Sequence, residues 1–294
     1  MADNIGNKAA HDYHLDTAPA QEGFYVKGAV HSDWGMRNRL SRIFRPESGN
    51  TVMLAFDHGY IMGPTAGLER VDLVIPPLAP YVDVLMGTKG AIRSCVPPTV
   101  PAAKCVRLTY DSTVLYDDMS NGGGFACDME NAIRMNADCV AVQTFIGAPG
   151  ESRSLELLCR AADAGTRYGI PTLGVVAVGK QMERTERFFL LATRVLAENG
   201  ANIVKSYYCD GFERVAAACP VPIVIAGGKK LPEDEALTMA YRAISDGARG
   251  VDMGRNIFQS KHPAAMCQAV AKIVHEKFTD REAYQFYQEL ASES

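Results

Sequence analysis

Lys205 is the first candidate for chemistry in this chain, because it lies inside an apolar run at residues 201–208. A lysine that is desolvated there, close to a second cation, has its pKa lowered toward neutrality. The free amine can then attack a ketone and form an imine. The alternative is a lysine whose ammonium simply reaches solvent at the rim of the fold.

Other reactive side chains follow similar apolar runs. Lys180 is a candidate second cation, or else a solvated loop lysine. Asp57 could transfer protons or orient the hydroxyls of a substrate, although it could also cap the next loop. His58 and Tyr207 are candidate substrate contacts beside these groups.

Two loops rich in glycine and basic residues, 226–230 and 254–256, follow the last two apolar runs. Backbone N–H groups that glycine leaves accessible, with an arginine nearby, form a nest for an anion. Plain turns are the alternative. The predicted phosphate contacts are Gly227, Gly228, Gly254 and Arg255.

These candidates need strands to position them, and the chain repeats one unit from residue 51 onward. Each unit is a short apolar run, a polar or glycine loop and an amphipathic segment. Apolar runs of this kind are typical of strands that are covered on both faces. Eight such units predict a closed, parallel (β/α)8 TIM barrel of the α/β class, with functional groups at the carboxyl ends of its strands. The eight runs are 51–56, 82–86, 105–108, 139–142, 172–177, 202–205, 223–226 and 250–253.

The clearest helices are predicted in the second half of the chain. One has an apolar stripe of Phe188, Leu191, Ala192 and Val195, and it ends before Gly200. Two others begin at prolines, at residues 232 and 263, where a missing N–H does no harm.

The ends of the chain do not fit the repeat. Residues 1–33 are polar and mixed, and we interpret them as an arm. Residues 34–294 are predicted to form a single barrel domain. Within it, 34–44 is a helix that could plug the bottom of the barrel or contact a neighbouring subunit, and 280–290 is a further short helix.

The bulk composition narrows the class of protein. With 294 residues, 47% hydrophobic residues and a net charge of −4, the chain is typical of a globular protein that binds neither nucleic acid nor an anionic membrane. It has neither a signal-peptide pattern nor a run of about 20 apolar residues, which favours a cytoplasmic protein. The eight cysteines form no Cys-x-x-Cys pair and the histidines no metal-binding spacing, so we expect free thiols and no metal.

Four segments resemble those of a known family: 55–59 (Ala-Phe-Asp-His-Gly), 204–208 (Val-Lys-Ser-Tyr-Tyr), 222–232 and 250–259. They are similar to the class I Schiff-base aldolases of the archaeal fructose-bisphosphate aldolase type. Within that family they most resemble the branch that processes phosphorylated autoinducer-2. The resemblance covers most of the chain.

The resemblance implies that Lys205 forms the imine, that Asp57 assists it and that the two glycine loops bind phosphate. It also implies acetyl transfer from 3-hydroxy-5-phosphonooxypentane-2,4-dione to coenzyme A, which releases dihydroxyacetone phosphate. Coenzyme A would be a co-substrate and no cofactor would stay bound. A homo-oligomer is implied as well, with a decamer as one form.

One position departs from the family pattern. Relatives often carry a proton-transferring tyrosine at the end of the fourth strand, where this chain has Phe145. Another group would then supply the proton, or the chemistry does not need one there. Three alternatives therefore stay open: an aldolase acting on a phosphorylated sugar such as fructose 1,6-bisphosphate, a barrel that only binds a phosphorylated ligand, and a flavin-phosphate barrel.

Overall fold

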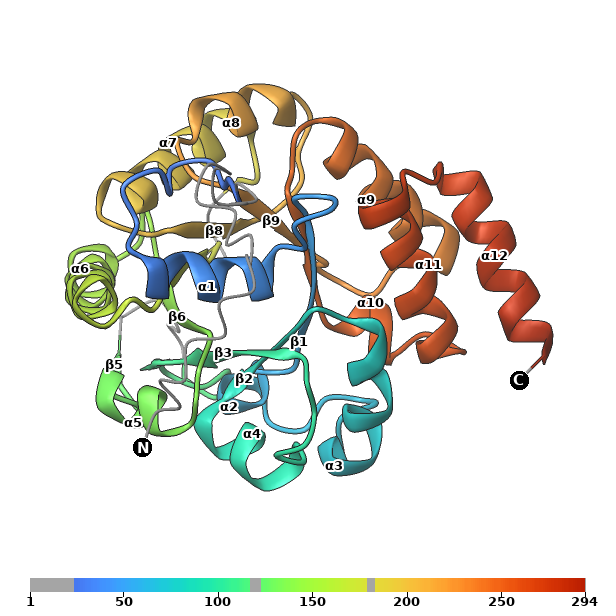
Figure 1. The fold of residues 1–294 in the computed structure, drawn as a ribbon, viewed down its shortest axis with the longest axis horizontal. Helices are drawn as coiled ribbons and strands as arrows, with labels where there is room; N and C mark the ends of the chain where they lie inside the picture. Colours follow the sequence, from blue (N-terminus) through green and yellow to red (C-terminus); the bar gives the residue numbers. More distant parts are fainter. Residues whose placement is uncertain (1–23, 117–122, 179–182, 294) are drawn as a thin grey trace, which may run out of the picture.

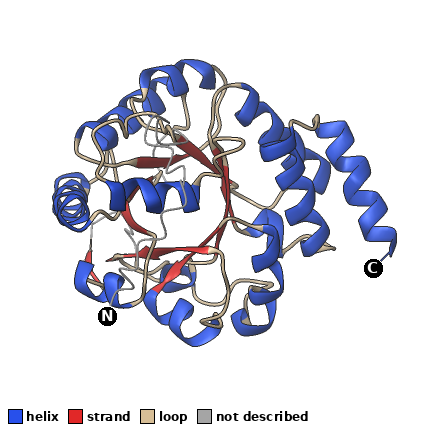
Figure 2. Ribbon diagram, viewed as in Figure 1, coloured by secondary structure: helices blue, strands red, loops and turns tan. Residues whose placement is uncertain are grey.

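The computed structural model describes residues 24–116, 123–178 and 183–293 and has a closed barrel at its centre. Figures 1 and 2 show the ring of strands surrounded by helices. Every pairing between neighbouring barrel strands is parallel. The (β/α)8 prediction is therefore confirmed.

Each of the eight predicted runs overlaps a barrel strand. In order around the barrel the strands are β1 (Thr51–Ala55), β2 (Val84–Thr88), β3 (Ala103–Arg107), β6 (Cys139–Thr144), β7 (Thr172–Val176), β8 (Ile203–Ser206), β9 (Ile223–Ala226) and β10 (Gly250–Met253). A separate two-stranded ribbon, β4 (Thr109–Tyr110) with β5 (Gly124–Phe125), lies beyond the carboxyl end of β3.

Side chains alternate between two apolar clusters along each barrel strand, as the pleat requires. On β8, for example, Ile203 belongs to the cluster inside the barrel and Val204 to the cluster under the helices. Because both faces are buried, the strands read as continuous apolar runs. The same alternation fixes which side of the sheet each charged residue faces.

The helices cover the outside of the barrel and its lower end. Those that follow the barrel strands include α4 (Lys89–Cys95), α5 (Met129–Arg134), α6 (Glu151–Tyr168), α7 (Glu186–Glu198), α8 (Phe212–Ala218), α9 (Glu233–Ser245) and α11 (Pro263–Glu276). Shorter segments are α2 (Gly59–Met62), α3 (Val71–Val74), a 3-10 helix η1 (Pro76–Tyr81) and α10 (Arg255–Phe258). Helix α12 (Asp280–Glu293) packs outside α9 and α11 (Figure 1).

The predicted helix in the 188–200 region is present. Its predicted apolar stripe is correct for Ala192 and for the partly buried Phe188 and Val195, but wrong for Leu191. The buried face of α7 consists of Phe189, Ala192, Thr193 and Leu196, and Leu191 is 59% exposed. Four consecutive large apolar residues, 188–191, make two adjacent stripes equally apolar. Only packing against the barrel selects one of them.

Helix α1 (Trp34–Ile43) closes the lower end of the barrel, as Figure 1 shows. Its first turn is capped by the Asp33 carboxylate, which accepts the Met36 N–H at 2.7 Å. Met36, Leu40 and Ile43 are spaced along one face and join the cluster inside the barrel. The predicted plug is therefore confirmed.

A network of polar groups around the Asp83 carboxylate holds the lower end together. The Asp83 carboxylate accepts hydrogen bonds from Arg45 Nε at 2.5 Å, from the Val52 N–H at 2.7 Å and from the ring of His275 at 2.9 Å. The other ring nitrogen of His275 lies 2.8 Å from Ser48 Oγ. The pKa of Asp83 is lowered because these hydrogen bonds outweigh its burial, which alone would raise it.

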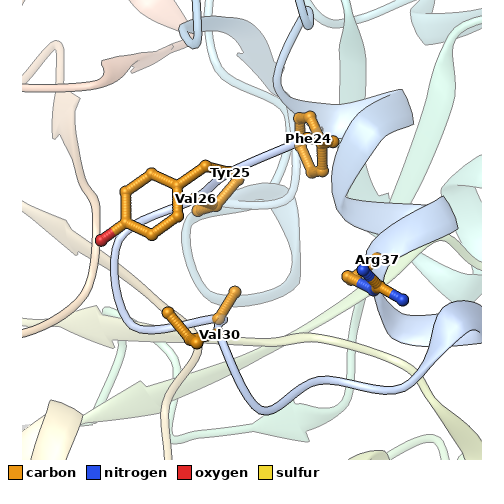
Figure 3. A pocket seen from close by; sticks show the side chains of 6 residues that line it. Phe24, Tyr25, Val26, Val30 and Arg37 are labelled. Atoms are coloured by element: carbon orange, nitrogen blue, oxygen red, sulfur yellow. The ribbon is translucent and has the colours of Figure 1, made fainter. Parts of the chain in front are cut away.

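The segment that precedes α1 also lies against the lower end. Lys27 Nζ donates to the Ala216 carbonyl at 3.0 Å, and Val26 is buried in the inner cluster. A pocket of about 210 Å³ lies between this segment and α1, lined by Phe24, Val30 and Arg37 among others (Figure 3). Because the strands begin at this end, the pocket is remote from the predicted site.

The composition predicted free thiols and no membrane-spanning segment. All eight cysteines are free. Within residues 24–116, 123–178 and 183–293, no helix has the length and apolar character that a bilayer crossing needs. The division into an arm and a single barrel domain stays a prediction.

Candidate active site

Four charged side chains point into the upper end of the barrel. Asp57, Arg107, Lys205 and Asp252 each continue the inward-facing register of their strand, and their exposed fractions are 5%, 4%, 9% and 1%. Arg107, Lys205 and Asp252 lie on β3, β8 and β10, and Asp57 is the second residue after β1. Two acids and two bases therefore meet where apolar side chains fill the rest of the barrel.

Lys205 contacts Asp252 directly. The Lys205 Nζ lies 2.8 Å from Asp252 Oδ2 and 3.8 Å from the sulfur of Met86, which also faces inward. The alternative of a lysine that reaches solvent is thus wrong. The inward, buried position is the one that imine chemistry requires.

The expected direction of the lysine pKa is wrong for the free site. Burial alone would lower the pKa of Lys205, but the negative charges of Asp252 and Asp57 outweigh burial and raise it. Burial, together with the nearby Asp57, raises the pKa of Asp252 despite the attraction of the lysine. The resting group is an ammonium next to a carboxylate that takes up a proton more readily than usual.

Asp57 forms a buried ion pair with Arg107, whose Nε donates to Asp57 Oδ2. The guanidinium also lies 5.0 Å from the centre of the Tyr60 ring, and the Tyr60 hydroxyl donates to Asp111 at 2.8 Å. Burial would raise the pKa of Asp57, but Arg107 and Lys205 outweigh it and lower the pKa. Asp57 is consequently a carboxylate and a weak base.

Three buried polar atoms in this group have no hydrogen-bond partner among the described residues. They are Arg107 Nη1 and both carboxylate oxygens of Asp252, of which Oδ2 forms the ion pair with Lys205. Leaving such a group unpaired disfavours folding by about 1–3 kcal/mol, and more for charged groups. Unpaired buried atoms that converge on one cavity are typical of a site that receives a ligand.

His58 lies beside the four charged groups rather than among them. Its Nε2 is 2.7 Å from Thr65 Oγ1, and its ring stacks on Phe258 with 5.8 Å between the centres. Burial, in the presence of nearby Arg255, lowers the pKa of His58 even though Asp57 opposes this. A neutral imidazole that can contact a substrate fits these neighbours.

The loop after β9 is held by Asn256 of α10, the short helix that follows the neighbouring strand β10. Gly228 has φ +67°, a conformation that glycine adopts without strain. Asn256 is fully buried, donates to the Gly227 carbonyl at 2.7 Å and accepts the Leu231 N–H at 2.8 Å. Asn256 therefore holds both ends of the predicted phosphate loop.

Gly254 and Arg255 follow β10 next to this loop. A Cβ on Gly254 would lie 2.4 Å from the Ala55 carbonyl oxygen, so only glycine fits there. No acidic side chain of the described residues forms an ion pair with Arg255. An arginine without an acidic partner beside a glycine loop is free to meet an anion.

Arg184, which lies against Tyr207, adds another cation to the same region. The Arg184 guanidinium lies 4.1 Å from the centre of the Tyr207 ring. A Cβ placed on Gly228 would lie 3.8 Å from Arg184 Nη1 and 4.0 Å from the Tyr207 ring. The structure thus brings Tyr207 next to the glycine loop and adds Arg184, which the sequence reasoning had missed.

The remaining predicted positions have different outcomes. Lys180 lies outside the described residues. Phe145 is buried, belongs to neither apolar cluster, and its backbone N–H donates to Ser154 Oγ at 3.0 Å. Asp252, to which the sequence reasoning assigned no role, forms an ion pair with Lys205.

Comparison with known proteins agrees with this geometry. The model of the DeoC/LacD family of aldolases matches residues 51–260. The chain therefore belongs to the DeoC/LacD aldolase family, and it is an enzyme of the class I aldolase type. The resemblance stated from sequence motifs is confirmed.

Individual relatives are similar over nearly the whole chain. The chain is 53% identical over 290 residues to the 3-hydroxy-5-phosphonooxypentane-2,4-dione thiolase of Enterobacter sp. (strain 638), covering 98% of both chains. It is 52% identical over 288 residues to an uncharacterized aldolase of Pasteurella multocida (strain Pm70), covering 98% of this chain and 99% of the relative. An archaeal fructose 1,6-bisphosphate aldolase structure superposes with a TM-score of 0.72 at 23% identity, over 82% of this chain and 99% of the other, which supports the fold.

Proposed function

We propose that this enzyme transfers the acetyl group of 3-hydroxy-5-phosphonooxypentane-2,4-dione to coenzyme A and releases dihydroxyacetone phosphate. The name of the Enterobacter relative, with 53% identity over nearly the whole of both chains, supports this substrate. The observation that carries the mechanism is the buried, inward-facing Lys205 at 2.8 Å from Asp252. That pair supplies a nucleophile and a proton acceptor in contact.

Imine formation begins with a proton transfer inside this pair. Asp252, whose pKa is raised, takes a proton from the Lys205 ammonium, and the free amine adds to C4 of the dione. The carbinolamine then loses water and leaves a protonated imine. The imine withdraws electrons from the C2–C3 bond and makes it breakable.

The phosphate holds the substrate while this happens. Gly227, Gly228, Gly254 and Arg255 offer backbone N–H groups and one guanidinium at the ends of β9 and β10, next to β8. A remote anion bound there places C4 over Lys205, so the reaction gains from a fixed orientation. Arg184, beside Tyr207, contributes further positive charge.

Coenzyme A completes the reaction. Its thiol loses a proton to Asp57 and the thiolate adds to C2, so that a C–S bond forms. The C2–C3 bond then breaks, and its electron pair enters the enamine on Lys205. Protonation of C3 by Asp57 and hydrolysis of the imine yield dihydroxyacetone phosphate and restore the lysine. Phe145 leaves no tyrosine to act as a base on the leaving fragment, and thiolysis needs none there.

The wider setting belongs to the same proposal. The branch that this chain resembles processes phosphorylated autoinducer-2, so the enzyme would act in the disposal of a quorum-sensing signal in the cytoplasm. It would work as a homo-oligomer, with a decamer as one form. Coenzyme A would be a co-substrate, and no cofactor or metal would stay bound.

Trapping with borohydride tests the nucleophile and the substrate together. Reduction in the presence of the dione should label Lys205 irreversibly. We expect Lys205→Met to lose the label and to lower the turnover number by ~10⁴-fold or more. Lys261→Met, which removes an exposed lysine, is the matched control and should change neither. An active enzyme that yields no adduct at Lys205 would remove the mechanism.

The same preparation separates the remaining alternatives. Consumption of the dione that depends on coenzyme A supports acetyl transfer. Cleavage of fructose 1,6-bisphosphate without coenzyme A would instead indicate an aldolase. Calorimetric binding with no turnover and no imine would indicate a barrel that only binds a phosphorylated ligand.

A further inference from the structure

We propose that Arg107 is a catalytic residue whose Nη1–H group donates a hydrogen bond to the acetyl carbonyl oxygen of the substrate as that oxygen becomes negative. The inference rests on the proposed function and deepens it. It assigns a role to a residue that neither the sequence motifs nor the phosphate site accounts for.

The first observation is an unused donor among the charged groups at the upper end of the barrel. Arg107 is 96% buried and continues the inward-facing register of β3 after Ala103 and Cys105. Its Nε is occupied by Asp57, whereas Nη1 has no acceptor among the described residues. A guanidinium that keeps one buried N–H free is suited to a ligand oxygen.

The second observation is that this donor cannot easily turn away. The Nε–Asp57 hydrogen bond fixes one edge of the guanidinium, and the Tyr60 ring lies against it at 5.0 Å. Tyr60 is itself held through its hydroxyl by Asp111, which also accepts the Gly123 N–H at 3.1 Å. A fixed donor needs little reorganisation when charge develops in front of it.

The order of strands shows which end of the substrate meets Arg107. The phosphate loops follow β9 and β10, adjacent to β8 with its Lys205, whereas β3 lies three strands away from β8. With the phosphate on C5 bound at those loops and C4 on Lys205, C2 extends toward β1 and β3. The acetyl carbonyl is the oxygen at that end.

The movement of electrons during thiolysis defines what the hydrogen bond from Arg107 does. When the thiolate adds to C2, the electron pair of the C2=O bond moves onto oxygen, and Arg107 Nη1–H stabilises the resulting oxyanion. Collapse re-forms C2=O, breaks C2–C3 and sends that electron pair into the enamine. No proton passes through Arg107, because a guanidinium stays protonated at working pH.

The nature of this donor also favours acetyl transfer over aldol cleavage. Aldol cleavage needs a base that removes a proton from the oxygen of the departing fragment. A permanent cation at that oxygen stabilises negative charge instead, and Phe145 has no ionisable group.

The test compares two ligands in the full-length protein. The dione carries the acetyl carbonyl, whereas dihydroxyacetone phosphate has the same phosphate and ketone without it. We expect Arg107→Gln to trap dihydroxyacetone phosphate on Lys205 with borohydride at a concentration dependence within about threefold of the wild type. Its turnover number for thiolysis of the dione should fall by ~10²–10³-fold.

Arg45→Gln is the matched control, because Arg45 also bonds a buried aspartate through Nε, but at the lower end of the barrel. It should keep the wild-type turnover number. Arg107→Lys retains a charge without the second N–H arm and should recover less than a tenth of the activity. If Arg107→Gln does not fold, Arg107→Ala assayed with added guanidinium replaces it, and partial recovery of thiolysis is expected.

The possible failures are distinct. An Arg107→Gln enzyme that loses trapping of both ligands would make Arg107 a support for Lys205 and overturn the inference. Unchanged thiolysis in that variant, or no recovery with guanidinium in Arg107→Ala, would overturn it as well. A wild-type enzyme that forms no imine would instead contradict the proposed function.

Discussion

The two ends of the barrel each bury an aspartate close to a strand, and they bind it in opposite ways. At the lower end, Asp83 accepts three hydrogen bonds, and both of its oxygens are used. At the upper end, Asp252 contacts only Lys205 among the described residues, and its Oδ1 has no partner. Hydrogen bonds lower the pKa of Asp83, whereas burial raises the pKa of Asp252.

The difference separates a structural carboxylate from a chemical one. A fully bonded carboxylate stabilises the ends of the elements that it joins, here Arg45 after α1, Val52 on β1 and His275 on α11. A carboxylate left partly unpaired lowers stability but stays available for a proton. The Asp252 carboxylate at the upper end is thus available for chemistry, whereas the Asp83 carboxylate at the lower end stabilises the fold.

Replacing each aspartate by asparagine should have the largest effects, on activity at the upper end and on stability at the lower end. We expect Asp252→Asn to reduce the turnover number by ~10²-fold or more, because the proton acceptor for Lys205 is lost. Its unfolding free energy should fall less than that of Asp83→Asn, because the buried Lys205 can lose its proton once the carboxylate is gone. Asp83→Asn should lose about 3 kcal/mol of unfolding free energy, because a buried bonded charge is removed from its partners. Urea denaturation and thiolysis assays measure both.

The outcome that contradicts this view is a reversal. An Asp252→Asn enzyme with full activity and lower stability would make Asp252 structural. An Asp83→Asn enzyme that folds as well as the wild type but turns over slowly would give the lower end a catalytic role.

Two glycines, one at each end of the barrel, allow a second comparison. Gly228 at the upper end and Gly49 at the lower end have nearly the same backbone angle, φ +67° and +68°. Alanine at either position should lower the unfolding free energy by about 1–2 kcal/mol, because both must enter the left-handed region. Only Gly228→Ala should raise the KM for the phosphorylated dione, by roughly tenfold, since an added methyl group intrudes on the phosphate loop.

Gly49→Ala is the control for strain, since a Cβ there meets nothing within 4 Å. Equal KM values in the two variants would separate the glycine loop from phosphate binding. Competition with inorganic phosphate gives an independent measure of the same loop.

The smallest expected effect is on the pH dependence of stability. The folded pKa of Asp83 lies below its ordinary value of 3.8, so its contribution is complete above that pH and is lost as pH falls through the lowered pKa. Asp83→Asn should therefore show a smaller drop in unfolding free energy between about pH 5 and pH 2 than the wild type. Equal drops in both proteins would show that other carboxylates control acid unfolding.

The fold was predictable because its signal is local. Strands buried on both faces need continuous apolar residues, and helices between them need one apolar stripe, so eight repeats are visible in the sequence. The face of α7 was not predictable. Its four consecutive apolar residues, 188–191, widen the apolar side of the helix, and packing against the barrel decides which of them are buried.

The site was predictable in part. Lys205 stood out as a cation in an apolar run, and Arg107 carries the same signal in 105–108 but was overlooked. The use of Asp252, and the raised pKa of Lys205 that follows, depend on a contact between residues 47 positions apart, on strands β8 and β10 that are separated by β9. That contact is set by strand register, which the sequence does not display.

The contact between Lys205 and Asp252 has a further consequence for the proposed cycle. An ammonium and a protonated imine carry the same single positive charge on the same nitrogen. Asp252 would thus face a cation both before substrate arrives and after the covalent bond has formed. The barrel interior would need no inflow of counter-ions or solvent between these two states, and the apolar layer beneath the pair could stay dry throughout turnover.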